Sequence, residues 1–211
     1  VEGIVSINAP DEGINVNANG SNTLIQACFV GLRPSNGAVA GNSGSPVNEE
    51  AALSINADGV SVRSNVVSGN DANGILIDSG ASGVTITNNV VGLNADADQD
   101  TGLLNSYGND GTGIVVNGDD NQIGDILTLF SSRSRSGTRG GPQPKAGTRG
   151  PLLGNVVSNN GNNGIRVRGD GNEVFANVVG ASGDGFTAFG NDNNGIVVAG
   201  TGSDPAEGNQ I

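Results

Sequence analysis

The densest group of potential metal ligands lies in the segment LNADADQDTG, where Asn94, Asp96, Asp98 and Asp100 occupy alternate positions. Carboxylate and amide oxygens from alternate residues of one loop can converge on Ca²⁺. The segment lacks the mid-loop glycine and closing glutamate of an EF-hand, and the related segments LRPSNGAVAGN and ASGDGFTAFGN lack the acidic cluster. Two interpretations stay open at this point: a calcium site, or an acidic turn that faces solvent.

Groups suited to acid–base catalysis are scarce in this chain. It has no histidine and a single tyrosine, Tyr107, next to a Gly-Asn turn where it can anchor a loop. The arginines Arg63, Arg166 and Arg168 could face one groove, but nothing in their spacing brings them to the aspartates. General acid–base catalysis requires a donor and a base within hydrogen-bond reach of the reacting group. The sequence therefore predicts no catalytic residue.

Basic residues concentrate in one stretch, which we interpret as an insertion at residues 125–152. Its central part, residues 131–150, contains prolines, has no apolar anchors, and repeats GTRG at 137–140 and 147–150. One interpretation is a flexible loop, and the other is a contact loop for an acidic partner, either a second copy of this chain or an acidic glycan. The basic residues that would make this contact are Arg133, Arg135, Arg139, Lys145 and Arg149.

The formal net charge of −12 argues against nucleic acid and anionic membranes as partners. Outside residues 133–149, which hold five of the nine basic residues and no acidic one, 9 − 5 = 4 basic residues face 21 acidic ones, which leaves −17 on the rest of the chain. Such a surface repels nucleic acid and anionic membranes. No apolar run reaches the roughly 20 residues that a membrane-spanning helix needs. We therefore expect neither a nucleic-acid partner nor membrane insertion.

The elements that must position these residues are repeats. Each copy begins with a glycine and continues as apolar, any residue, apolar. The copies are GINVN (13–17), GILID (74–78), GIVVN (113–117), GIRVR (164–168) and GIVVA (195–199). Apolar residues at i and i+2, interrupted every few residues by Gly, Asn or Asp, favour short strands over helices. In each copy we expect the first and third residues after the glycine to point inward. Self-similarity of this kind predicts a solenoid.

A second motif, Asn-x-Val or Asn-x-Ile, alternates with the first. We interpret its asparagines as a ladder that stacks at one corner of successive coils and hydrogen-bonds the turn backbone. Cys28, in QACFVG, takes the place of the asparagine in TNNVVG and FANVVG, and is expected to be a small buried substitute. The proposed ladder residues are Asn65, Asn89, Asn121, Asn155, Asn177 and Asn209.

The larger period is about 60 residues once the insertion is subtracted, with two coils per unit and a long loop alternating with a short one. The segments 64–80, 88–124 and 154–169 resemble the right-handed parallel β-helix repeats of bacterial secreted and cell-surface proteins, in the pectate-lyase-like solenoid superfamily. The resemblance implies an all-β right-handed parallel β-helix of about six to eight coils in an extracellular or cell-surface setting. It implies activity only weakly, because adhesins share such repeats with polysaccharide lyases, hydrolases and epimerases.

Residues 1–211 are thus expected to form a single solenoid. Neither end shows the polar cap that a terminal coil needs, so we expect it to belong to a longer solenoid or to an assembly stacked head-to-tail, which generates filaments. The preferred function is an extracellular structural one: a filament, stalk or adhesin segment that self-associates or attaches to surfaces. The alternatives are a polysaccharide lyase or epimerase and a passive glycan-binding module.

Overall fold

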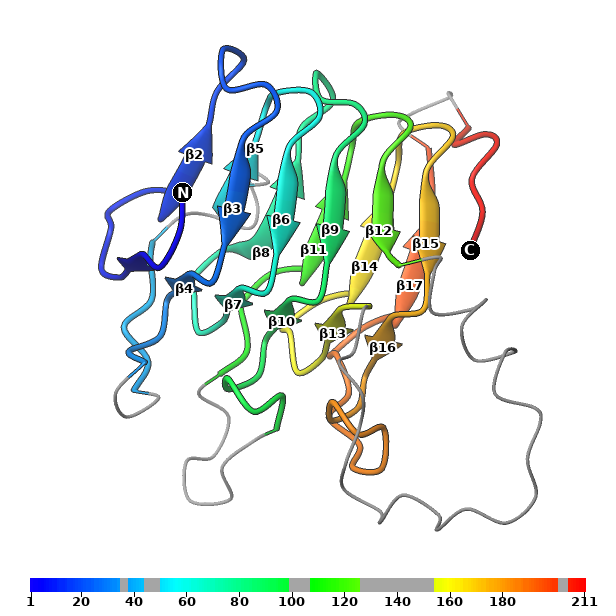
Figure 1. Ribbon diagram of the computed structural model, residues 1–211. Coiled ribbons are helices and arrows are strands. Elements are labelled where there is room, and N and C mark those ends of the chain that lie inside the picture. Colours follow the sequence, from blue (N-terminus) through cyan, green and yellow to red (C-terminus); the bar gives the residue numbers. More distant parts are fainter. Residues whose placement is uncertain (35–37, 44–49, 99–106, 126–153, 201–204) are drawn as a thin grey trace, which may run out of the picture.

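The computed structural model describes residues 1–34, 38–43, 50–98, 107–125, 154–200 and 205–211. Strands in these ranges form three sheets, here numbered by the first strand of each (Figure 1). Sheet 1 consists of β1 (Val5–Ser6), β4 (Phe29–Val30), β7 (Val66–Val67), β10 (Val90–Val91), β13 (Val156–Val157) and β16 (Val178–Val179). Sheet 2 consists of β2 (Ile14–Val16), β5 (Ala51–Ile55), β8 (Asn73–Ile77), β11 (Ile114–Val116), β14 (Ile165–Val167) and β17 (Ile196–Val198). Sheet 3 consists of β3 (Leu24–Gln26), β6 (Ser61–Arg63), β9 (Thr85–Thr87), β12 (Gln122–Gly124) and β15 (Glu173–Phe175).

Every strand pairs in parallel with the equivalent strand of the next coil. In sheet 2, for example, Ile114 lies opposite both Ile75 of the preceding coil and Ile165 of the following one. Coils therefore stack at the normal strand spacing of about 4.8 Å. The fold is a right-handed parallel β-helix, as the repeats predicted, and the two six-stranded sheets define six coils in the described part.

The core is a narrow column of aliphatic side chains enclosed by the three sheets. The inward positions of the glycine-led repeats meet there as predicted, and Ile75, Ile77 and Ile114 are completely buried. The structure contains one more copy of this repeat, which the sequence pattern missed. In β5, Leu53 and Ile55 take the inward positions, but Ala52 stands where the other copies have glycine. Among the described residues the core has no aromatic member, which matches the aromatic content of 3%.

Apolar side chains also cover the outside of sheet 1. The first residue of each short strand points outward, and loops between sheets 1 and 2 fold back over this row. Leu32 and Tyr107 pack on Val66, and Tyr107 is buried, so it anchors a loop as expected. Farther along, Leu93 packs against Val156. The strands β7 and β13 are thus buried on both faces, which explains why their sequence is a Val-Val pair and not an alternation of apolar and polar residues.

Connections between sheets 1 and 2 alternate between long and short. The long ones span residues 31–50, 92–113 and 180–195, and the short ones span residues 7–13, 68–72 and 158–164. This alternation produces the 60-residue unit seen in the sequence.

The basic insertion enters at one defined corner. It separates β12 from β13, where the other coils turn from sheet 3 to sheet 1 through two residues. A Cβ on Gly124 would lie 1.7 Å from the Phe175 carbonyl oxygen, and one on Gly154 would lie 1.8 Å from that of Ala176. Both flanks therefore pack directly on the next coil. Residues 126–153, which include the predicted contact residues, lie outside the described ranges.

We expect the β-helix to fold without the insertion. Replacing residues 125–154 with one asparagine would recreate the turn that Asn88 makes with a φ of 55°. Loop-closure entropy grows by about 0.6 kcal/mol per doubling of loop length, so the free energy of unfolding should rise by about 1–3 kcal/mol. Urea denaturation of both proteins measures the difference. A lower value in the shortened chain would mean that the insertion contributes contacts to the fold.

Candidate functional site

The corner between sheets 3 and 1 carries a continuous amide ladder. The Asn65 backbone N–H donates to Asn89 Oδ1 (3.0 Å), and Asn65 Nδ2 donates to the same atom (2.9 Å). Asn89 repeats this pattern with Asn155, and Asn155 repeats it with Asn177. Cys28 begins the described ladder: its backbone N–H donates to Asn65 Oδ1 (2.9 Å) and its buried Sγ donates to the Gln26 carbonyl (3.2 Å). Cys28 therefore replaces an asparagine at this corner.

A second ladder lies where sheet 1 leads into sheet 2. Its members are Asn42, Asn70, Asn109, Asn160 and Asn191. None of these five asparagines stands in an Asn-x-Val or Asn-x-Ile motif, so they are absent from the predicted ladder. In the short-looped coils, this asparagine follows the first-ladder asparagine by five positions, in NVVSGN and NVVSNN. That fixed spacing could have identified it.

Asn121 and Asn209 do not belong to the same ladder as the other predicted members. They lie at the corner between sheets 2 and 3, where Asn121 N–H donates to Asn172 Oδ1 (2.9 Å) and Asn172 N–H donates to Asn209 Oδ1 (2.8 Å). The Asn-x-Val and Asn-x-Ile motifs look alike because both place an asparagine just before a strand. The single predicted ladder is thus two ladders at different corners.

Only part of the predicted calcium loop, up to Asp98, lies within the described residues. Asn94 Oδ1 accepts the backbone N–H of Asp96 (3.1 Å) and of Asp98 (3.0 Å), so this oxygen closes the turn. Asp100 lies outside the described residues. Within the part of the chain that the structure describes, no three Asp, Glu, Cys or His side chains are grouped so that they could hold a metal ion.

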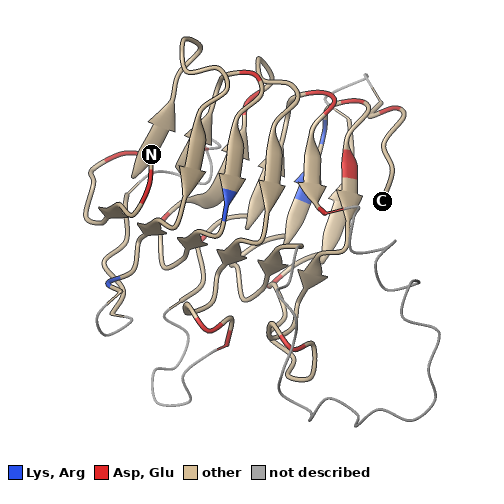
Figure 2. Cartoon of the chain, viewed as in Figure 1, with Lys and Arg blue, Asp and Glu red and all other residues tan. Residues whose placement is uncertain are grey.

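The arginines do not share one groove. Arg63 lies on the outer face of sheet 3, where Nε and Nη2 donate to Gln26 Oε1 (2.9 and 2.7 Å). Arg166 lies on the outer face of sheet 2, beside Val115 and Val197, and is half-buried. Arg63 and Arg166 therefore lie on the outer faces of different sheets. In Figure 2 the acidic positions of the described part outnumber the basic ones, and many of them lie in the turns.

The turn from sheet 2 to sheet 3 is an acidic corner with a structural use. Asp58 Oδ1 accepts the Ser82 N–H (2.9 Å) of the next coil, and Asp119 and Asp170 make the equivalent bonds farther along. Carboxylates that accept backbone N–H groups in this way hold the turns of neighbouring coils together.

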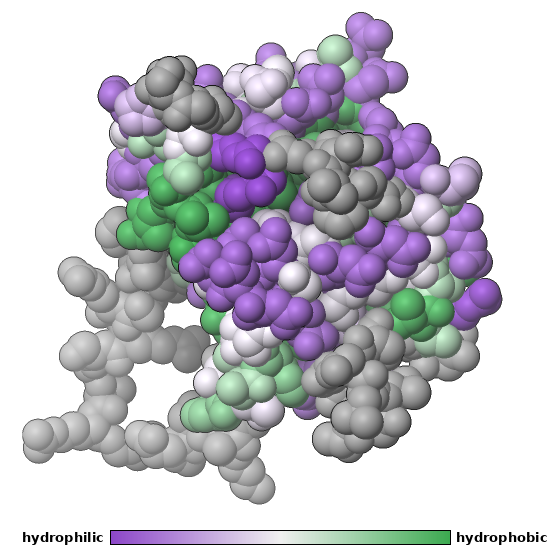
Figure 3. Space-filling view, turned by 180° about the vertical axis from the view of Figure 1, so that it is seen from behind, coloured by the Kyte–Doolittle hydropathy of each residue, from purple (hydrophilic) through white to green (hydrophobic). Residues whose placement is uncertain are grey.

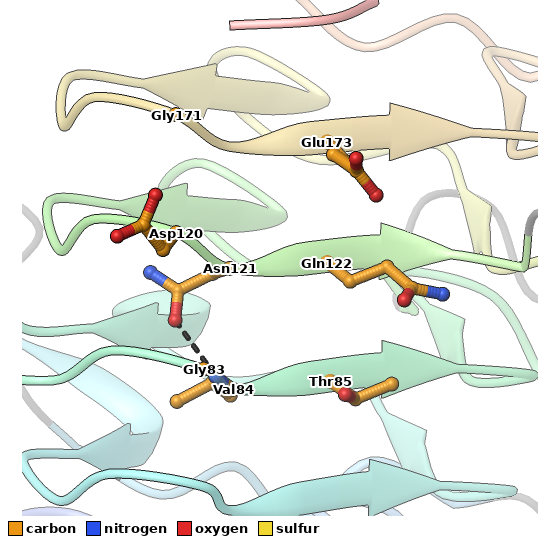
Figure 4. Close-up of a pocket in the computed structure, with 8 residues that line it drawn as sticks. All are labelled: Gly83, Val84, Thr85, Asp120, Asn121, Gln122, Gly171 and Glu173. Atoms are coloured by element: carbon orange, nitrogen blue, oxygen red, sulfur yellow. Dashed lines mark hydrogen bonds between the residues drawn. The ribbon is translucent and has the colours of Figure 1, made fainter.

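Two hollows open on the outer faces of the sheets. One, of about 350 Å³, lies on sheet 3 beside the acidic corner. Its polar side chains are those of Thr85, Asp120, Gln122 and Glu173, together with Asn121 (Figure 4). Thr85, Gln122 and Glu173 lie one above another on successive coils, while Asp120 stands at the turn.

The other hollow, of about 280 Å³, lies on the first coils of sheet 2. It is lined by Glu12, Glu50 and Asp78 together with several asparagines. Glu12 and Glu50 belong to none of the sequence motifs described above. Figure 3, which shows the molecule from behind, has hydrophilic residues over most of the visible surface and hydrophobic ones in separate patches. Both hollows are concave, polar and built from side chains of different coils.

Comparison with known proteins adds no relative: no family model, curated protein or solved structure matches this chain. The described residues also contain no helix of the length and hydropathy that crossing a membrane would require.

Proposed function

We propose that this chain is an extracellular structural element, a β-helical filament, stalk or adhesin segment. The observation that carries the proposal is the continuity of bonding along the axis. Three parallel sheets and two asparagine ladders link successive coils, and a third ladder adds to them from Val84 onward. A solenoid of this kind gains length by adding equivalent coils, because each coil contacts only its neighbours.

Self-association is the second part of the proposal. The inward side chains Ile196 and Val198 of the last described coil are 38% and 41% exposed, whereas their counterparts Ile165 and Val167 are fully buried. A coil of a second copy, stacked on this end, would cover them. Head-to-tail stacking of copies, with the basic stretch reaching the acidic surface of a neighbour, would produce a filament.

Electron microscopy at neutral pH, with calcium and then with EDTA, tests this proposal. We expect filaments whose fibre diffraction shows an axial repeat of about 4.8 Å. Filaments that disappear in EDTA would support a calcium contact through the loop at Asn94, Asp96, Asp98 and Asp100. Replacing residues 125–154 should weaken assembly, and unchanged assembly would contradict the role of the basic stretch.

The competing function, a polysaccharide lyase or epimerase, predicts a different result. Incubation with a panel of acidic polysaccharides would release unsaturated uronides, which absorb in the ultraviolet. Discrete particles in the microscope together with such a product would replace the structural proposal with the enzymatic one.

A further inference from the structure

The hollow on sheet 3 contains polar groups that the fold itself does not use. Asn121 Oδ1 accepts the Val84 N–H (2.8 Å), and Gln122 Nε2 donates to the Gly124 carbonyl (2.9 Å), so these amides are engaged. In contrast, the side chains of Thr85, Asp120 and Glu173 make no hydrogen bond or ion pair with any other described residue. Three oxygen-bearing side chains therefore remain available to a ligand.

The carboxylates next to the hollow, in contrast, are engaged by the fold. Asp119 and Asp170 belong to the same two turns, yet each accepts a backbone N–H from the next coil (2.8 and 2.7 Å). Asp120 instead stands between the glycines of the adjacent turns, Gly83 and Gly171. A Cβ on Gly171 would lie 2.3 Å from Asp120 Oδ1, so a larger residue there would displace this carboxylate.

An apolar surface adjoins the polar row. Phe175 is two residues after Glu173 on β15 and therefore projects from the same face of the sheet. Its partner in the next strand is Gly124, which has no side chain, and Phe175 is half-buried. A ligand on this strip would meet carboxylate, amide and hydroxyl groups next to an aromatic ring.

We propose that this strip binds a neutral saccharide. Sugar hydroxyls donate to the carboxylates of Asp120 and Glu173 and exchange hydrogen bonds with Thr85, and the apolar face of a pyranose ring packs on Phe175. A uronate is disfavoured, because the hollow has two carboxylates and no basic residue among those that line it. The mixture of carboxylate, amide, hydroxyl and ring favours a sugar over a basic peptide, which would need only the carboxylates.

Isothermal titration calorimetry with cellohexaose and mannohexaose as neutral probes, and hexagalacturonate as the acidic one, tests the proposal. We expect at least one neutral probe to bind weakly and hexagalacturonate to give no binding heat. Glu173→Gln should weaken the neutral probe at least tenfold, since it removes an acceptor charge without changing size. Thr85→Val, on a different strand, should also weaken it.

The matched control is Glu207→Gln. It removes the same charge from the acidic corner, but Glu207 does not line the hollow, so binding should equal that of the parent protein. The proposal is overturned by the absence of neutral-probe binding, by equal binding of hexagalacturonate, or by unchanged affinity in Glu173→Gln. Binding of a lysine hexapeptide in place of both sugars would also overturn it. Since the titration uses dispersed protein, its result is independent of filament formation.

Discussion

Asn89→Ala should lower the free energy of unfolding by about 3–5 kcal/mol, at the upper end for a single substitution. Asn89 is buried, and its Oδ1 accepts both the backbone N–H and Nδ2 of Asn65 (3.0 and 2.9 Å). Its Nδ2 donates to the Val62 carbonyl and to Asn155 Oδ1, both at 2.9 Å. Alanine removes these bonds and leaves buried polar groups on two neighbouring coils without partners.

Thermal and urea denaturation measure this loss, and the melting temperature should fall by about 10 °C for a domain of this size. Asn193→Ala is the matched control, because Asn193 is exposed and its Nδ2 makes one 3.3 Å bond to Asn162. We expect that control to change stability by less than about 0.5 kcal/mol. Equal effects of the two substitutions would show that the ladder does not carry coil-to-coil stability.

Gly124→Ala should destabilise the protein by about 2–5 kcal/mol. Gly124 has a φ of 99°, which L side chains rarely adopt, and its Cβ would lie 1.7 Å from the Phe175 carbonyl oxygen. Backbone strain contributes about 1–2 kcal/mol, and displacing a neighbouring strand adds about 1–3 kcal/mol. The change would act where the chain leaves sheet 3 for the basic insertion.

Gly83→Ala separates these two contributions. Gly83 also has a positive φ, 62°, but its Cβ would meet nothing closer than 3.9 Å. Its substitution should cost only the strain, about 1–2 kcal/mol. Denaturation curves in which Gly124→Ala is no worse than Gly83→Ala would contradict the close packing of coils at the insertion.

Local patterns carried most of the information about the architecture. The glycine-led apolar pairs identified the inward positions of sheet 2, and Cys28 was placed correctly because it stands in an asparagine motif. The sequence pattern did not reveal which outward residues are buried. Leu76 and Val115 look free in the sequence, yet both are buried and pack together on the outside of sheet 2. A two-residue period says which face a side chain occupies, but not what covers that face.

The candidate sites also differ in whether their residues are close in the sequence or meet only in the folded chain. The sequence alone grouped Asp96, Asp98 and Asp100, because one residue separates each from the next. Asp120 and Glu173, which share the hollow on sheet 3, are separated by the whole insertion. They meet because β12 and β15 are neighbours in a parallel sheet, a relation that depends on the register of successive coils.

By itself, the sequence determined the solenoid fold, its β-strand repeats, the alternation of long and short loops and the position of the insertion. These follow from local periodicity, since each coil repeats the same pattern of apolar, polar and turn residues. Only the tertiary structure decided which asparagines share a ladder, which carboxylates hold turns together and which remain available to a ligand. Those properties depend on contacts between residues from different coils, and stacking alone brings such residues together.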